Sequence, residues 1–197
     1  RSLRFEHGRG LDGRLLGRYV GHAPGELQDI FEDMLLLKRA PLTHDTMVRR
    51  NCFAKVGGFD TQLRVATDHD MWLRVSARCQ VAFIDATVAA YRQHDSQLSN
   101  QSRLRGEYVR DLDYILDKVA LDLPPARRTA QVSGAMARAR ALVDIHRACH
   151  LFLAEGRERG ISHFRQTLNS GELLPADSPQ VSSIVISYAV AADAADA

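Results

Sequence analysis

The pattern of apolar residues changes near residue 100 of this 197-residue chain, and the change limits the folds available to it. Before residue 100, glycines and short apolar runs predict brief strands and helices joined by turns. After it, apolar residues recur at the three- and four-residue spacing of α-helices. We therefore expect an α/β part over residues 1–100, a helical part over residues 101–175 and a tail over residues 176–197.

The α/β part is expected to hold short elements. Residues 1–24 contain five glycines and predict a hairpin or loop, in which the clearest strand is 15–20. Helices are expected at residues 26–37, 50–56 and 68–77. Strands are expected at residues 46–49, 81–84 and 88–91. Gly57 can take the left-handed conformation that often ends a helix, and Phe59 is expected to be buried just beyond it.

The helical part is predicted to contain three helices, at residues 102–121, 132–154 and 161–168. The last two are expected to form a helical hairpin. His146 and His150 lie one turn apart on the middle helix, a spacing that can bind zinc, but the glutamate of a metalloprotease helix is missing. We therefore expect these histidines to be a surface pair rather than a metal site.

The composition argues against several classes of protein. A net charge of +2 gives no basis for nucleic-acid binding, and the arginines of the helical part do not share one helical face. The three cysteines have neither disulfide nor metal spacing, which favours a reduced, cytoplasmic compartment. No apolar run approaches the roughly 20 residues of a membrane-spanning helix. Because the chain starts at Arg1 and not at methionine, we expect it to be a piece of a longer protein.

Three motifs follow one another within residues 47–99. They are Gly57-Gly58-Phe59-Asp60, then Asp68-x-Asp70-x-Trp72-Leu73-Arg74, then Tyr91-Arg92-x-His94-x-x-Gln97-Leu98-Ser99. In this order and at this spacing, the region over residues 15–99 resembles the acceptor-side, C-terminal half of a family 2 inverting glycosyltransferase. The resemblance implies the C-terminal part of a GT-A (Rossmann-like) domain, followed here by an α-helical region.

The resemblance also implies a reaction. A sugar would pass from a nucleoside-diphosphate sugar to a saccharide or lipid-linked acceptor, with inversion, in polysaccharide or cell-envelope assembly. A lipid-linked acceptor would bring the enzyme to the membrane periphery. The family uses a divalent cation, Mn²⁺ or Mg²⁺, whose main binding motif would lie before Arg1. The donor-binding half would lie there too, so this chain alone is expected to be inactive.

Asp68 matches the catalytic base of the family, which must take a proton from the acceptor hydroxyl. The preceding residue is Thr67, where the family often has glutamate. Trp72 lies one helical turn further and could form the floor of an acceptor sugar site. Asp70 is counted with the substrate-binding residues, although its four-residue spacing also favours an ion pair with Arg74. Asp68 and Asp70 are not taken as the metal motif, because no buried apolar strand precedes them.

The third motif supplies two further candidates by resemblance. His94 matches the histidine that completes the coordination of the metal in many GT-A enzymes. Arg92 could contact the diphosphate or pair with a buried carboxylate. The basic pair Arg49-Arg50 is expected to brace the fold through carboxylates near Asp60 or Asp70.

Other interpretations stay open from the sequence. Asp68 could be only a helix N-cap and Trp72 only a core residue. The chain could instead be a non-catalytic fragment, or a helical protein-interaction module whose hairpin over residues 132–168 docks a partner. The tail over residues 180–188 resembles the opening strand of a further glycosyltransferase domain, or else it is a frayed end.

Overall fold

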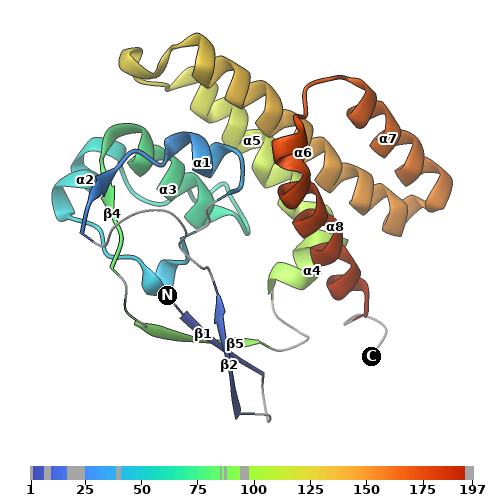
Figure 1. Ribbon diagram of the computed structural model, residues 1–197, viewed down its shortest axis with the longest axis horizontal. Coiled ribbons are helices and arrows are strands. Elements are labelled where there is room, and N and C mark those ends of the chain that lie inside the picture. Colours follow the sequence, from blue (N-terminus) through green and yellow to red (C-terminus); the bar gives the residue numbers. More distant parts are fainter. Residues whose placement is uncertain are drawn as a thin grey trace.

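The computed structural model describes residues 2–6, 10–16, 25–38, 41–84, 86, 88–93 and 98–193. Short strands and helices precede residue 98, and helices account for nearly all of the rest (Figure 1). The coarse expectation of a part with strands followed by a helical part is therefore confirmed. None of the described helices combines the length and the apolar character needed to cross a membrane.

Two small sheets form in the first part. The larger has the order β2-β1-β5, from strands β1 (Ser2–Glu6), β2 (Gly10–Leu16) and β5 (Ala89–Gln93). Strand β1 pairs antiparallel with β2 and parallel with β5. The expected hairpin in residues 1–24 is confirmed, but its second strand covers only the first two residues of the expected 15–20, and residues 17–24 lie outside the described residues.

The second sheet corrects one helix prediction. Strand β3 (Leu27–Gln28) pairs antiparallel with β4 (Val81–Ala82), so Leu27 faces Ala82 across the pair. Helix α1 (Phe31–Leu35) is consequently much shorter than the expected 26–37. The strand predicted at residues 46–49 is also wrong, since these residues are described and form no strand.

Helices α2 (Arg50–Val56) and α3 (Thr67–Arg78) confirm their predictions to within one residue at each end. Gly57 ends α2 with a φ of 79°, and its backbone N–H donates to the carbonyl of Phe53 over 2.8 Å. A side chain with a Cβ rarely adopts such a φ, which accounts for glycine at this position. Phe59, however, is 46% exposed, so the prediction that it is buried is wrong.

The helical part begins with α4 (Leu98–Leu104) and α5 (Glu107–Leu121), where one continuous helix was expected. The helical conformation is interrupted at Gly106, which has a φ of 69°. Helices α6 (Ala130–Glu155) and α7 (Arg157–Asn169) form the expected hairpin and pack closely along each other.

The last helix is α8 (Ser178–Asp193), and it contradicts both alternatives for residues 180–188, an opening strand and a frayed end. Ile184, Tyr188 and Ala191 are buried at spacings of four and three residues, as on one face of a helix. Ile184 and Tyr188 pack with Leu142 and Ile145 of α6. Packing against α6 thus outweighs the strand preference of this β-branched segment.

The core extends across residue 100. Side chains from α1, α3, α5 and α6 belong to one buried cluster, and α3 packs against α1, α2 and α5. Figure 1 shows α8 running beside α6 and α4. Helix α3, which carries most of the candidate site, is therefore held from several directions.

Candidate functional site around the start of helix α3

The turn that leads into α3 is held by a residue from another helix. The Asp111 carboxylate of α5 accepts hydrogen bonds from the backbone N–H groups of Arg64, Val65 and Ala66, over 3.0, 2.7 and 3.0 Å. Arg64 and Val65 precede the N-cap residue Ala66, so their N–H groups have no acceptor within α3 and need one elsewhere. Asp111 therefore anchors the turn that leads into α3 and sets its position relative to α5.

Asp68 lies in the first turn of α3, two residues after the N-cap residue Ala66. The interpretation of Asp68 as the N-cap is therefore wrong. Its side chain is half-buried, and its Oδ1 accepts a hydrogen bond from the backbone N–H of His69 over 2.8 Å. Burial raises the pKa of Asp68, although this backbone hydrogen bond opposes the shift. A carboxylate with a raised pKa is a stronger base than one in water.

Asp70 lies inside the protein with 0% of its surface exposed. Its Oδ2 accepts hydrogen bonds from Nε and Nη2 of Arg74 over 3.0 and 2.6 Å, and its Oδ1 lies 3.0 Å from Nζ of Lys118. The ion pair expected between Asp70 and Arg74 is therefore present. Substrate contact by Asp70 stays a prediction that this burial does not favour.

The ion-pair network around Asp70 also includes the first motif, Gly57-Gly58-Phe59-Asp60. Lys118 of α5 also pairs with Asp60 over 2.5 Å, and Arg74 donates to the carbonyls of Val56 and Gly58 over 2.5 and 2.9 Å. The acidic end of the first motif and the acidic helix of the second are thus joined through two cations. Because Arg74 and Lys118 fill this role, the bracing expected of Arg49-Arg50 is wrong, and both of those residues are exposed.

Trp72 is packed in the core and only 7% exposed. Its ring meets Phe59 edge-on, with centroids 6.2 Å apart, and its Nε1 is buried with no hydrogen-bond partner. The interpretation of Trp72 as a core residue agrees with this packing. Its role as the floor of a sugar site stays a prediction.

The two candidates of the third motif are only partly placed. Arg92 lies on β5, where its backbone is paired with Phe5 of β1, and His94 lies outside the described residues. Within the described part of the chain, no group of three or more His, Cys, Asp or Glu side chains is arranged to hold a metal ion. The expected Mn²⁺ or Mg²⁺ site, with His94 as a ligand, stays a prediction.

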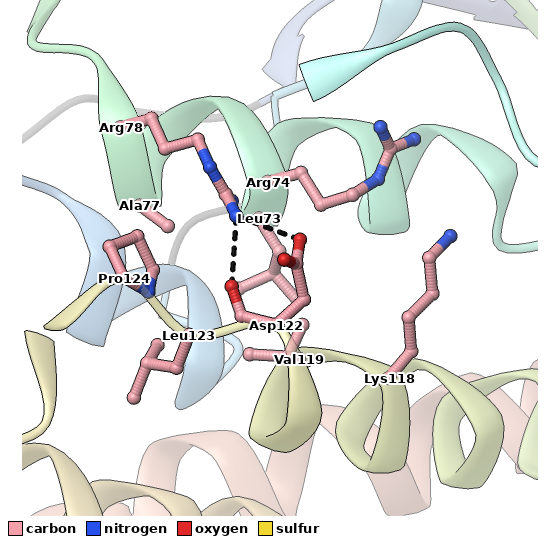
Figure 2. Close-up of a pocket in the computed structure, with 9 residues that line it drawn as sticks. All are labelled: Leu73, Arg74, Ala77, Arg78, Lys118, Val119, Asp122, Leu123 and Pro124. Atoms are coloured by element: carbon pink, nitrogen blue, oxygen red, sulfur yellow. Dashed lines mark hydrogen bonds and ion pairs between the residues drawn. The ribbon is translucent and has the colours of Figure 1, made fainter. Parts of the chain in front are cut away.

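A small hollow opens between α3 and the end of α5, away from Asp68. Figure 2 shows Arg78 reaching across it to Asp122, where its Nη2 donates to the backbone carbonyl over 2.8 Å and to the carboxylate over 2.7 Å. Arg74 and Lys118 also line this hollow, and both are paired with Asp70. Its cations are therefore already matched by carboxylates.

One buried polar group contradicts the sequence interpretation. His146 was expected on the surface, but it is 4% exposed and lies between Tyr108 and Tyr188, with ring centroids 5.2 and 5.7 Å away. Burial, assisted by the charge of Arg103, lowers its pKa to about 3. The position of His146 four residues after buried Leu142 was the signal that could have revealed this.

No protein-family model matches the chain, and searches of curated proteins and of solved structures found no match either.

Proposed function

We propose that this chain is the acceptor-side part of an inverting glycosyltransferase, with Asp68 as the catalytic base. The observation that carries the proposal is the half-buried Asp68 carboxylate, whose pKa is raised by burial, on the first turn of a firmly anchored helix. The order of the three motifs along the chain supports the same assignment.

The scaffold around Asp68 suits this role. Asp111 anchors the turn before α3, and the buried ion pair between Asp70 and Arg74 stabilises α3 itself. A base must stay within hydrogen-bond reach of the hydroxyl that it deprotonates, so rigid positioning contributes to the rate. In the proposed reaction Asp68 accepts the proton of the acceptor hydroxyl while that oxygen attacks the anomeric carbon and the nucleoside diphosphate leaves.

The finer parts of the proposal concern the complete enzyme. A GT-A donor half would precede Arg1, and the parallel pairing of β1 with β5 is compatible with a larger sheet. A divalent cation, Mn²⁺ or Mg²⁺, would offset charge on the departing diphosphate, with His94 as a ligand and Arg92 near the diphosphate. A saccharide or lipid-linked acceptor and a cytoplasmic location complete the proposal.

The test is Asp68→Asn in the longer protein that includes the upstream sequence. We expect transfer to fall by about 10²–10⁴-fold while donor affinity stays unchanged, because the amide cannot take the proton. Asp117→Asn on α5 is the matched control, since Asp117 pairs with Arg140 at the surface. Turnover retained in Asp68→Asn would remove Asp68 from the mechanism.

The chain by itself offers a second measurement. We expect calorimetry with UDP-glucose and Mn²⁺ to detect no tight binding, because the proposal places the donor half upstream. Micromolar binding would contradict that placement.

A helical protein-interaction module is the second candidate. It is favoured by Phe152, Leu153 and Leu168 of the α6–α7 hairpin, which are exposed apolar side chains. An exposed apolar patch often marks a contact surface, and Phe152 and Leu153 are adjacent near the end of α6. If Phe152→Ser abolishes a biological activity that Asp68→Asn leaves intact, the interaction function is the better description.

A further inference from the structure

Two of the three cysteines meet in the folded chain, although their spacing in the sequence does not indicate a pair. Cys52 lies in the first turn of α2, and Cys79 is the C-cap residue of α3. Their side chains are in hydrogen-bond contact with each other. Both are free thiols that remain partly exposed. Two adjacent and accessible thiols can undergo thiol–disulfide exchange.

The packing of α2 on α3 keeps the two cysteines beside each other. Arg74 of α3 donates a hydrogen bond to the carbonyl of Val56 at the end of α2, over 2.5 Å. The backbone N–H of Cys79 donates to the carbonyl of Val75 over 2.7 Å, and its side chain packs against the buried core. Cys79 is therefore a fixed partner for Cys52.

Helix α2 can supply the small movement that a covalent bond between the sulfurs requires. Two thiols in hydrogen-bond contact are further apart than the sulfurs of a disulfide, which lie about 2.05 Å from each other. Helix α2 has seven residues, and none of them is fully buried. A small shift of α2 toward Cys79 therefore moves no fully buried side chain of this helix.

The environments of the two sulfurs suggest an order of reaction. Burial and the hydrogen bond with Cys52 raise the pKa of the Cys79 thiol, although the charges of Lys55 and Arg78 oppose the shift. Cys79 therefore stays protonated and can donate its hydrogen to the sulfur of Cys52. Because the nucleophile in thiol–disulfide exchange is a thiolate, Cys52 is the residue that attacks first.

We propose that Cys52 and Cys79 form a redox-sensitive dithiol, which a low-molecular-weight disulfide such as oxidised glutathione converts to an intramolecular disulfide between α2 and α3. The sulfur of Cys52 attacks one sulfur of the small disulfide, and the other sulfur leaves and takes up the proton that Cys52 has lost. The sulfur of Cys79 then attacks that of Cys52 and releases the second small thiol with the proton of Cys79. The protein loses two electrons and two protons, and the small disulfide gains them.

This modification site goes beyond the proposed transfer and does not depend on it. The third cysteine, Cys149 of α6, serves as an internal reference. Burial raises the pKa of its thiol to about 11, and its side chain packs against a buried apolar cluster. A thiol with so high a pKa forms little thiolate, so Cys149 should react slowly.

The test is incubation of the chain with oxidised glutathione at mildly alkaline pH, then acid quenching, alkylation of the remaining thiols and mass spectrometry. We expect the unmodified chain to lose two thiols without retaining glutathione, and residues 52 and 79 to appear in one crosslinked peptide. Excess dithiothreitol should restore both thiols. Because the crosslink closes a loop over residues 53–78, it should raise the midpoint of thermal unfolding by several degrees.

Variants separate this reaction from general oxidation. Cys79→Ser should stop at the mixed disulfide, with one glutathione on Cys52, because the second attacking thiol is missing. Cys149→Ser is the matched control and should form the crosslink as the unmodified chain does. Where Cys79→Ser fails to fold, Cys52→Ser replaces a residue on a helix without buried side chains, and it should form no crosslink.

Three results would overturn the proposal. They are retention of all thiols by the unmodified chain, an intramolecular crosslink that persists in Cys79→Ser or Cys52→Ser, and disulfides that form only between two chains. None of these results bears on transfer by Asp68, which the Asp68→Asn measurement tests separately.

Discussion

At the scale of single residues, Asp70 has the most demanding environment of the second motif. A carboxylate without solvent contact is tolerated only where cations and hydrogen bonds replace water, and Arg74 and Lys118 do so here. This use of the motif is structural. Of the two aspartates of this motif, Asp68 is the one that keeps partial contact with water.

Asp70→Asn should destabilise the protein by about 3–5 kcal/mol, because the two cations would lose their buried partner. Urea unfolding at pH 7 measures the change. Asp117→Asn, which breaks the exposed pair with Arg140, should stay within about 0.5 kcal/mol of the unmodified protein. Equal effects of the two substitutions would contradict the structural role of Asp70.

Asp68 and Asp70 lie on different faces of α3 and therefore have different roles. Asp70 stabilises the fold, and Asp68 is the proposed base. Residues two apart on a helix point to different sides, so Asp70 turns into the core when Asp68 does not. This division was visible in the sequence spacing. The burial that raises the pKa of Asp68 was not visible, since it depends on the helices packed around α3.

At the scale of elements, the start of α3 depends on α5. Asp111 lies 45 to 47 residues beyond the three backbone N–H groups that it accepts from. Helix α3 itself supplies no side-chain cap. The position of the proposed base is therefore maintained by a contact between distant parts of the chain.

Asp111→Ala should cost about 1–3 kcal/mol, because three backbone donors lose their acceptor. Hydrogen exchange should also speed up at the amides of residues 64–66. Asp113→Ala on the same helix breaks the partly exposed pair with Arg147 and should cost less than about 1 kcal/mol. Unchanged exchange at residues 64–66 in Asp111→Ala would rule out this anchoring role.

The α6–α7 hairpin depends on a close approach at Gly160. A Cβ added there would lie 2.5 Å from the Cα of Phe152, which is backbone and cannot move aside. Gly160→Ala should therefore destabilise the protein by about 1–3 kcal/mol, as overpacking does. Thermal unfolding is the measurement.

Gly134 is the matched control on α6. A Cβ there meets nothing within 4 Å, so Gly134→Ala should stabilise the helix by about 0.5–1 kcal/mol. Substitutions of the same kind should then have effects of opposite sign. A stabilising Gly160→Ala would show that the helices can separate at this contact.

At the scale of the whole molecule, the two parts expected from the sequence share one core. Trp72 and Leu73 of α3 belong to the same buried cluster as Ile115 of α5 and Val143 of α6. A perturbation on either side of residue 100 should therefore affect the stability of the whole assembly rather than of one half.

Acid should destabilise this shared core through two histidines. Burial lowers the pKa of His146 to about 3 and that of His69 to about 4, while an unfolded histidine titrates near 6.5. Below pH 6.5 the unfolded chain therefore binds protons that the folded protein does not, and stability falls as the pH decreases toward 4. Between pH 7 and pH 5 the loss should be about 2 kcal/mol for each histidine.

Urea unfolding across this pH range measures the loss. His146→Gln should lower the slope of stability against pH by about half, whatever its effect at pH 7. A slope that is unaffected by His146→Gln would show that this histidine titrates normally in the folded protein.

Features that depend on neighbours along the chain could be predicted from the sequence alone. Helix α2 with its glycine end, helix α3, the α6–α7 hairpin and the pair of Asp70 with Arg74 all follow from spacings of a few residues. Helical periodicity, a positive φ and contact one turn away are local properties, so they can be predicted without a fold.

Features that join distant segments arise from the folded arrangement and could not be predicted from local spacing. Folding brings together the surfaces behind four such features: the β3–β4 pair, the anchoring of residues 64–66 by Asp111, the burial of His146 and the helical state of residues 180–188. Burial and pairing energies at these places exceed the local preferences that the sequence expresses. The location of Asp68 was therefore predictable, while the environment that would make it a base arises from the packing of α5 and its neighbours around α3.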